Sequence, residues 1–125
     1  MLGDREAIAT VAVRDLTVAK KFYATTLRLK QVDTEGDEAV VYATGTSRLV
    51  VYRSQFARTN QATAVTWNVG ADVDGVVREL KSNGVTFEHY DMPGMKREGD
   101  IHVAGGTRAA WFKDPDGNIH SLVNG

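Results

Sequence analysis

Three histidines are the side chains in this sequence best suited to acid–base or metal chemistry, and they lie far apart: His89, His102 and His120. No two of them have the short spacing with which a helix or a turn places two imidazoles on one metal ion. His89 and His120 fall in predicted strands, where a structural histidine is the more common interpretation. His102 falls in a stretch without a regular pattern. It is therefore the candidate for acid–base catalysis, with Asp91 or Tyr90 as its neighbour.

The irregular stretch that runs from Tyr90 to His102 also carries apolar side chains suited to ligand contact. Tyr90, Met92 and Met95 are adaptable apolar groups. Loops on a rigid scaffold often carry binding residues. Two interpretations stay open: a binding loop, or a loop that packs its own apolar residues onto the sheet.

The composition excludes several chemistries and partners. There is no cysteine, so thiolate nucleophiles, disulfides and cysteine-ligated zinc are excluded. Fifteen basic and sixteen acidic residues give a net charge of −1, and no basic excess exists to neutralise nucleic-acid phosphates. No stretch approaches the roughly 20 apolar residues of a membrane span, and the N-terminal residues do not resemble a signal peptide. We expect one cytoplasmic domain over residues 1–125, with no nucleic-acid or membrane partner.

An internal repeat predicts the elements that position these residues, and each copy follows the order strand, helix, strand, strand, strand. In the first module, about 7–53, we expect a strand at 7–13, a helix within 16–27 that Asp15 can cap, and strands at 38–44 and 48–53. In the second module, about 63–123, we expect a strand at 63–69, a helix that Asp72 can cap and that ends at Asn83-Gly84, a strand at 85–90, and a hairpin of 107–113 with 118–123.

This order predicts an α+β fold of two tandem βαβββ modules that form a curled mixed sheet with a groove. One helix covers one face of each sheet and leaves the other face open. A groove on that open face is where a small molecule would bind.

The order and spacing of these segments resemble the vicinal oxygen chelate superfamily, which includes glyoxalase I, extradiol dioxygenases, fosfomycin-resistance enzymes and bleomycin-binding proteins. The resemblance covers nearly the whole chain, but this fold hosts several chemistries as well as simple binding. It is carried by these segments: Val13-Arg14-Asp15-Leu16, Phe22-Tyr23, Leu27, Asp72-Val73-Asp74, Leu80, Gly84-Val85, and Ala110-Trp111-Phe112-Lys113-Asp114-Pro115-Asp116-Gly117-Asn118.

The resemblance implies four metal-ligand positions, and none of them holds a ligand of the expected kind. They fall at Ile8, at Ala64 (or Val65, if a one-residue gap is placed differently), near Tyr52, and at Ser121. Divalent metals need imidazole or carboxylate donors, and isoleucine and alanine have no donor atom. We therefore expect no metal and no cofactor, and none of the family's chemistry that uses the ion as a Lewis acid.

Strand alternation selects the side chains expected on the open face. They are small, apolar or lightly polar, which suits a flat aromatic or apolar ligand held by stacking and a few hydrogen bonds. Trp67 is expected in the core, whereas the sequence leaves open which way Trp111 faces. The candidate ligand-binding residues are Thr10, Tyr52, Thr66, Asn68, Tyr90, Met92, His102, Trp111 and Ser121.

Three functions are compatible with these observations. The first is a metal-free, homodimeric protein that sequesters an aromatic or apolar metabolite or antibiotic, and it resembles the antibiotic-binding branch of the family. The alternative is a glyoxalase-like isomerase, lyase or dioxygenase. It would use a non-standard metal site built from His102, Asp91 or Glu88, or metal-free acid–base catalysis by His102. The third is a structural or regulatory module whose groove is filled by a partner or by its own loop.

Overall fold

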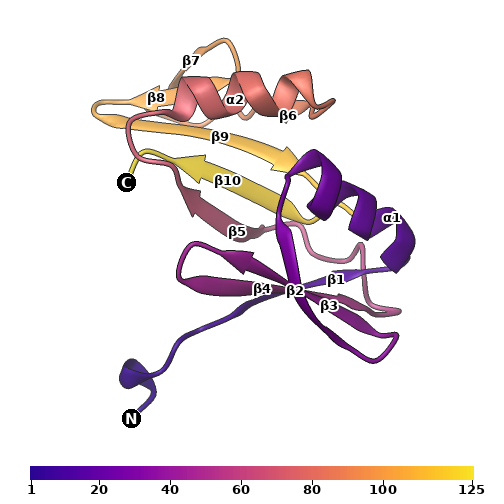
Figure 1. Cartoon of the computed structure of the whole chain (residues 1–125). Coiled ribbons are helices and arrows are strands. Elements are labelled where there is room, and N and C mark those ends of the chain that lie inside the picture. Colours follow the sequence, from indigo (N-terminus) through magenta and orange to yellow (C-terminus); the bar gives the residue numbers. More distant parts are fainter. The chain divides into compact units, whose positions relative to one another are not determined.

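The computed structural model describes the backbone of residues 1–125 and every side chain except that of Glu35. The chain divides into two compact units, Met1–Asn60 and Gln61–Gly125. Each unit contains a sheet and a helix of its own (Figure 1). The predicted α+β class, with its tandem modules, is confirmed.

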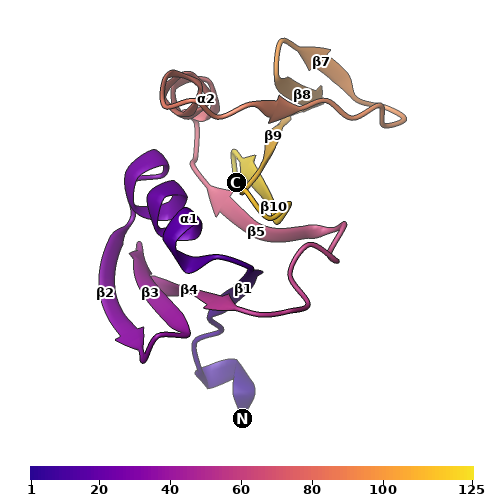
Figure 2. The same cartoon turned by 90° about the vertical axis from the view of Figure 1, so that its right-hand side faces the viewer.

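The first unit contains one helix with a π-helical extension and a four-stranded mixed sheet. Its elements are a 3-10 turn (Leu2–Asp4), β1 (Ala9–Val13), α1 (Leu16–Lys20), the π-helical extension (Lys21–Thr26), β2 (Lys30–Glu35), β3 (Ala39–Thr44) and β4 (Ser47–Arg53). The strand order is β1-β4-β3-β2 (Figure 2). β1 runs parallel to β4, with Thr10 opposite Val50, and the other pairs are antiparallel.

The start of α1 follows from a capping side chain, as predicted. The carboxylate of Asp15 accepts hydrogen bonds from the backbone N–H groups of Thr17 and Val18. These donors have no partner within the helix, so the cap stabilises its first turn. Tyr23 of the π-helical extension is fully buried, and its ring stacks on that of Tyr42 in β3 with 5.9 Å between ring centroids. The stack fixes the helical segment on one face of the sheet.

Strand β2 is a correction to the sequence prediction, which assigned no strand to residues 30–35. Its residues from Lys30 to Thr34 are exposed, and no apolar alternation marks them. β2 lies at the end of the sheet and pairs only with β3. This strand is therefore defined by the pairing of its backbone with the apolar strand β3, and its own side chains give no strand pattern.

The second unit repeats the arrangement with more strands. Its elements are β5 (Thr63–Asn68), α2 (Val73–Ser82), β6 (Phe87–Glu88), β7 (Lys96–Glu98), β8 (Ile101–Ala104), β9 (Thr107–Lys113) and β10 (Ile119–Val123). The strand order is β5-β10-β9-β8-β7, and β6 also pairs with β9. β5 runs parallel to β10, and the other pairs are antiparallel.

Helix α2 buries one stripe against its sheet, formed by Val73, Val77 and Leu80. This spacing places all three side chains on one side of a helix. The helix ends before Gly84, whose φ of +94° is the left-handed conformation that glycine adopts without strain. Asp72 stands at the predicted cap position, but its side chain makes no capping hydrogen bond. The prediction of a side-chain cap is wrong there.

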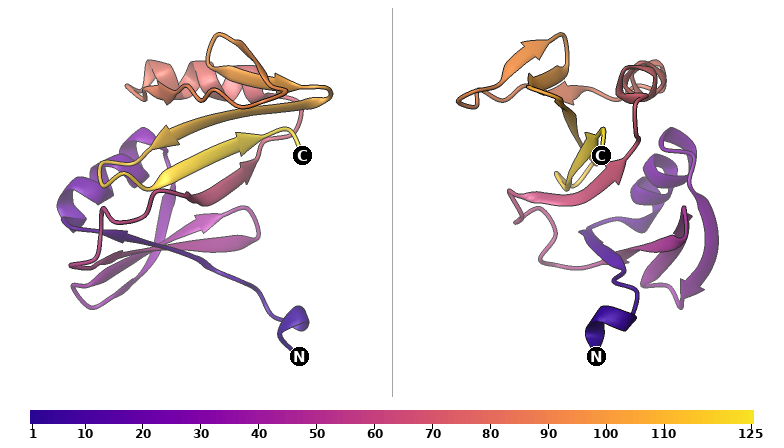
Figure 3. Two further views of the ribbon diagram at one scale, coloured as in Figure 1. Left: turned by 180° about the vertical axis from the view of Figure 1, so that it is seen from behind. Right: turned by 90° about the vertical axis from the view of Figure 1, so that its left-hand side faces the viewer.

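The middle of the second unit differs from the sequence prediction in two ways. The predicted strand at 85–90 shortens to Phe87–Glu88. The predicted irregular stretch contains the β7–β8 hairpin instead. The long hairpin of β9 and β10 has the predicted bounds to within one residue at its start and end (Figure 3).

No helix among the described residues is long and apolar enough to span a membrane. The cytoplasmic location stays a prediction.

Candidate ligand-binding faces

The open face of the second sheet brings together candidates from three neighbouring strands. Ser121 of β10 lies opposite Thr66 of β5 on one side and opposite Trp111 of β9 on the other. Side chains of directly paired residues lie on the same face, so these three share it. The hydroxyl oxygens of Thr66 and Ser121 are 2.8 Å apart, within hydrogen-bonding distance.

The structure answers which way Trp111 faces. Its neighbours in the strand, Ala110 and Phe112, are buried on the opposite face, the one that α2 covers. Successive side chains of a strand alternate between faces. Trp111 therefore lies on the open face and is half-buried there. Trp67 lies on the covered face, as predicted, and its indole N–H donates to His120.

Trp111 is the centre of an aromatic cluster with Tyr90 and His102. Its ring meets that of His102 nearly edge-on, with 4.8 Å between centroids and an interplanar angle of 84°. The Tyr90 ring is 5.4 Å from Trp111 at 77° and 6.0 Å from His102. Such edge-to-face pairs stabilise aromatic groups beyond the burial of their area.

The prediction that His102 lies on a loop is wrong. It belongs to β8, opposite Ala109 of β9, and is only 1% exposed. A signal was present in the sequence, because Ile101 and Val103 flank His102 and give a short β-branched run.

The contacts of His102 also change its expected chemistry. Its Nε2 accepts a hydrogen bond of 2.9 Å from the backbone N–H of Tyr90. Its Nδ1 is buried and has no hydrogen-bond partner among the described residues. The ring is therefore not oriented by a carboxylate, as a general base would be, and Asp91 is exposed.

Two further candidates lie at the margins of this face. Asn68 pairs with Val123, which places its side chain on the side of Thr66, and its Oδ1 accepts from the backbone N–H of Gly70. Met92 is half-buried in the turn between β6 and β7.

The remaining candidates, Thr10 and Tyr52, belong to the first unit. Together with Ile8, Val50 and residues 38–39 they line a mainly apolar pocket of about 470 Å³. Ile8 and Tyr52 are among the large apolar side chains that the structure leaves exposed. The first unit thus has an apolar face of its own around Tyr52.

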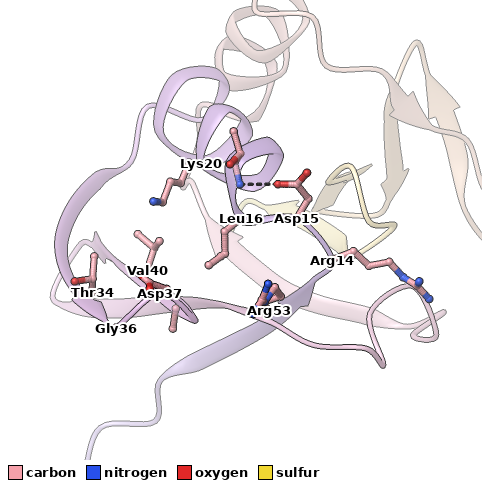
Figure 4. Close-up of a pocket in the computed structure, with 11 residues that line it drawn as sticks. Arg14, Asp15, Leu16, Lys20, Thr34, Gly36, Asp37, Val40 and Arg53 are labelled. Atoms are coloured by element: carbon pink, nitrogen blue, oxygen red, sulfur yellow. Dashed lines mark hydrogen bonds between the residues drawn. The ribbon is translucent and has the colours of Figure 1, made fainter.

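A polar pocket of about 530 Å³ in the first unit was not predicted (Figure 4). It lies where α1 begins, beside the turn between β2 and β3. Arg53 at its edge is already paired with Glu38. The lining residues with charged side chains are Arg14, Asp15, Lys20, Asp37 and Arg53. Their mixed charges explain why sequence pattern gave no signal for this pocket.

The other two histidines are engaged within the second unit. His120 is fully buried, and its Nδ1 accepts from Trp67 at 3.0 Å. Burial lowers the pKa of His120 to about 4, so its ring is neutral near pH 7.

His89 follows β6 rather than lying in a strand, so that prediction is wrong. Its Nε2 is 2.7 Å from Asp100, whose other oxygen accepts from Lys81 at 2.7 Å. The hydrogen bonds from Lys81 and from His89 lower the pKa of Asp100. Arg97 lies 2.8 Å from the second ring nitrogen of His89. This network ties α2 to the β7–β8 hairpin.

The residues at the four implied metal positions do not fit a divalent ion. Ile8 and Ala64 have no donor atom, and the hydroxyl of Ser121 is paired with Thr66. Nowhere in the part of the chain that the structure describes do three or more histidine or carboxylate side chains gather as metal ligands would.

A helix across one face of a mixed sheet, built twice in one chain, defines a known class of α+β proteins. The chain belongs to the glyoxalase/bleomycin resistance protein/dioxygenase superfamily, whose family model matches residues 7–121. The resemblance stated from the sequence is confirmed. No curated protein sequence matches the chain.

Solved structures of the superfamily share this fold at low sequence identity. Fosfomycin resistance protein FosX from Mesorhizobium loti has a TM-score of 0.69 and 14% identity, over 100% of this chain and 94% of that one. Lactoylglutathione lyase from Agrobacterium tumefaciens has 0.68 and 17%, over 95% and 92%. A glyoxalase/bleomycin resistance protein/dioxygenase from Alicyclobacillus acidocaldarius has 0.72 and 17%, over 96% and 90%. Identities this low show the fold alone.

Proposed function

We propose that this protein binds a small aromatic or apolar molecule without a metal ion and holds it unchanged. The observation that carries the proposal is the cluster of Trp111, Tyr90 and His102 on the open face of the second sheet. Beside it lie the hydroxyl groups of Thr66 and Ser121. Aromatic walls with a few placed polar groups are typical of small-molecule sites.

The donor chemistry supports binding rather than metal-assisted catalysis. The positions at which the family would hold its ion carry Ile8, Ala64, Tyr52 and Ser121, and these residues do not replace imidazole and carboxylate ligands. Sequestration needs affinity only, and about −8 kcal/mol gives micromolar binding.

The geometry of His102 does not favour the enzymatic alternative. A general base needs a free ring nitrogen within reach of substrate. In His102 the nitrogen that could take up a proton, Nε2, already accepts from the Tyr90 backbone N–H, and Nδ1 carries the proton of the neutral ring, so neither nitrogen is free to act as a base. Fosfomycin resistance and lactoylglutathione lyase activity are named for the similar structures, and the function proposed for this chain includes neither.

The two tryptophans of the chain provide a direct test. In Trp67→Phe, Trp111 is the only tryptophan and should report on its face. We expect planar aromatic compounds, naphthalene among them, to quench its fluorescence saturably. In Trp111→Phe the remaining Trp67, on the covered face, should not respond.

Removal of the indole should weaken binding while the fold is kept. We expect Trp111→Ala to lose about fivefold in affinity for any compound so identified, since an aromatic pair contributes about 1 kcal/mol beyond its area. Circular dichroism is the control for folding. Equal quenching in the two single-tryptophan variants, or unchanged affinity in Trp111→Ala, contradicts the proposed site. Chemical conversion of the bound compound, detected by mass spectrometry, contradicts the binding function.

A further inference from the structure

A hydrogen-bond donor without a partner lies on the open face of the second unit. The backbone N–H of Tyr90 donates to His102 Nε2. A backbone N–H can only donate, so Nε2 is the acceptor and the ring carries its proton on Nδ1. This Nδ1 is buried and has no partner among the described residues.

Such a donor is costly unless something accepts from it. A buried polar group without a hydrogen bond destabilises a fold, whereas an apolar side chain of similar shape would avoid that cost. The neighbouring groups are the rings of Trp111 and Tyr90, and aromatic faces are weak acceptors at best. An acceptor from outside the described chain would therefore satisfy this donor.

The charges around this position indicate a neutral acceptor. Register places Glu88 opposite Trp111, and Glu88 is paired with Lys113 at 3.1 Å. Arg97, opposite His102 in β7, is occupied by His89 and by the carbonyl of Gly99. A ligand carboxylate buried here would have to draw the exposed guanidinium of Arg97 away from these two contacts, and burial of a charge without a close counter-charge is strongly unfavourable.

We propose that His102 Nδ1–H is the specificity-determining donor of the ligand site, and that the ligand is a planar aromatic ring with a neutral acceptor, a carbonyl or a ring nitrogen, at its edge. The inference rests on the proposed function. Trp111 lies in register with Ser121 and edge-on to His102, which puts a stacking surface between the donor and the hydroxyl pair. Because His102 is enclosed, ligand entry moves one of the half-buried rings that contact it.

Quinoline and naphthalene are matched probes, because they have the same shape and differ by one ring nitrogen. Each is titrated into the ¹⁵N-labelled full chain at mildly alkaline pH, and the indole N–H signal of Trp111 is followed. We expect quinoline to bind about tenfold more tightly, since one hydrogen bond to an otherwise unpaired donor contributes on this order. Equal affinities overturn the inference but leave the proposed function standing. A chain that binds neither ring overturns both.

Two substitutions separate the donor from the fold. His102→Gln keeps an acceptor that reaches the Tyr90 N–H and removes the Nδ1 donor. His102→Asn does the reverse, with an amide donor at the position of Nδ1. We expect the ratio of quinoline to naphthalene affinity to fall to about one in His102→Gln and to persist in His102→Asn, whatever affinity each variant has for naphthalene alone. If His102 only supports the fold, His102→Asn should be the more damaged variant, because it lacks the acceptor for the Tyr90 N–H that His102→Gln keeps. A preference for quinoline that survives in His102→Gln overturns the proposal.

Discussion

His102 and His120 are separated by one strand of the same sheet and face opposite sides of it. On the side covered by α2, His120 accepts from a tryptophan side chain. On the open side, His102 accepts from the backbone N–H of Tyr90, and no described residue is a hydrogen-bond partner of its second nitrogen. The same side chain is thus structural in one place and suited to recognition in the other. The difference arises because His120 lies on the covered face of the sheet and His102 on the open face.

The sequence predicted the structural role of His120 but not the placement of His102. Both follow an isoleucine, and the local patterns are nearly alike. What separates them is pairing across strands, which brings Trp111 and Tyr90 against His102. Such contacts depend on register, and register is not visible in the residues of one strand.

The buried ring of His120 should make the protein less stable in mild acid. Burial lowers its pKa from 6.5 to about 4. Below pH 6.5 the unfolded chain therefore binds a proton that the folded chain does not. This part of the stability is fully present above pH 6.5 and is lost as the pH falls towards 4, by about 3 kcal/mol in all. Urea unfolding at a series of pH values measures it.

A variant without the imidazole is the control for this pH dependence. His120→Asn keeps an acceptor near the position of Nδ1 and has no group that titrates in this range. It should be less stable overall and should show a flatter stability curve between pH 6.5 and 4. If the two curves have the same slope, the loss does not arise from His120. Asp100, with its lowered pKa, loses its contribution only below its ordinary value of 3.8.

At the scale of elements, apolar pattern predicted most strands that carry buried apolar side chains, the end strands β1 and β5 among them, and failed for β2, β7 and β8. β3, β4, β9 and β10 carry buried apolar side chains and were found where expected. β2 and β7 were missed because their described side chains are exposed and, apart from Val32, polar or charged, and the four-residue β8 was assigned to an irregular stretch. An edge strand needs only a partner for its backbone, and polar side chains there discourage aggregation.

The turn between β9 and β10 depends on a single carboxylate. Asp114 is 5% exposed, and its Oδ1 accepts from the backbone N–H groups of Asp116 and Asn118 at 2.9 and 2.8 Å. Its Oδ2 accepts from the side chain of Asn118. Asp114→Ala removes the acceptor of these three hydrogen bonds from a buried turn. It should destabilise the protein by about 2–3 kcal/mol, measured by urea unfolding at neutral pH.

Asp33 provides the matched control for this prediction. It is exposed in β2, and its Oδ1 accepts from the neighbouring N–H of Thr34. Asp33→Ala should change the free energy of unfolding by no more than about 0.5 kcal/mol. If the two variants lose similar amounts of unfolding free energy, burial of the Asp114 hydrogen bonds does not add to the stability of the protein.

At the scale of the whole molecule, the sequence predicted the fold class and family but not the polar features of its sites. The order of strands and helices was enough to predict the fold class, because α+β modules of this kind follow from the apolar pattern and the lengths of the connections. The unpaired nitrogen of His102 and the polar pocket at the start of α1 arise from side chains distant in sequence. The pattern of neighbouring residues does not indicate which of these distant side chains come together.

We predict that the protein forms a homodimer. Val18, Val32 and Phe56 are exposed by 47%, 43% and 70%, and within its own sheet each end strand has one unpaired edge. A second copy can cover both features under two-fold symmetry. Sedimentation equilibrium across the micromolar range should give twice the mass of the chain. A single species with the mass of one chain contradicts this prediction.

The parallel pairing within each sheet also determines the order in which a nascent chain can fold. β1 emerges from the ribosome early, yet its partner in the sheet is β4, the last strand of its unit. β5 likewise pairs with β10, at the far end of the second unit. Neither ladder can form until the whole module between its strands has been synthesised, and closing so long a loop costs entropy before any contact repays it. Folding should therefore proceed module by module, with the apolar strand Ala9–Val13 exposed to chaperones until Ser47–Arg53 arrives.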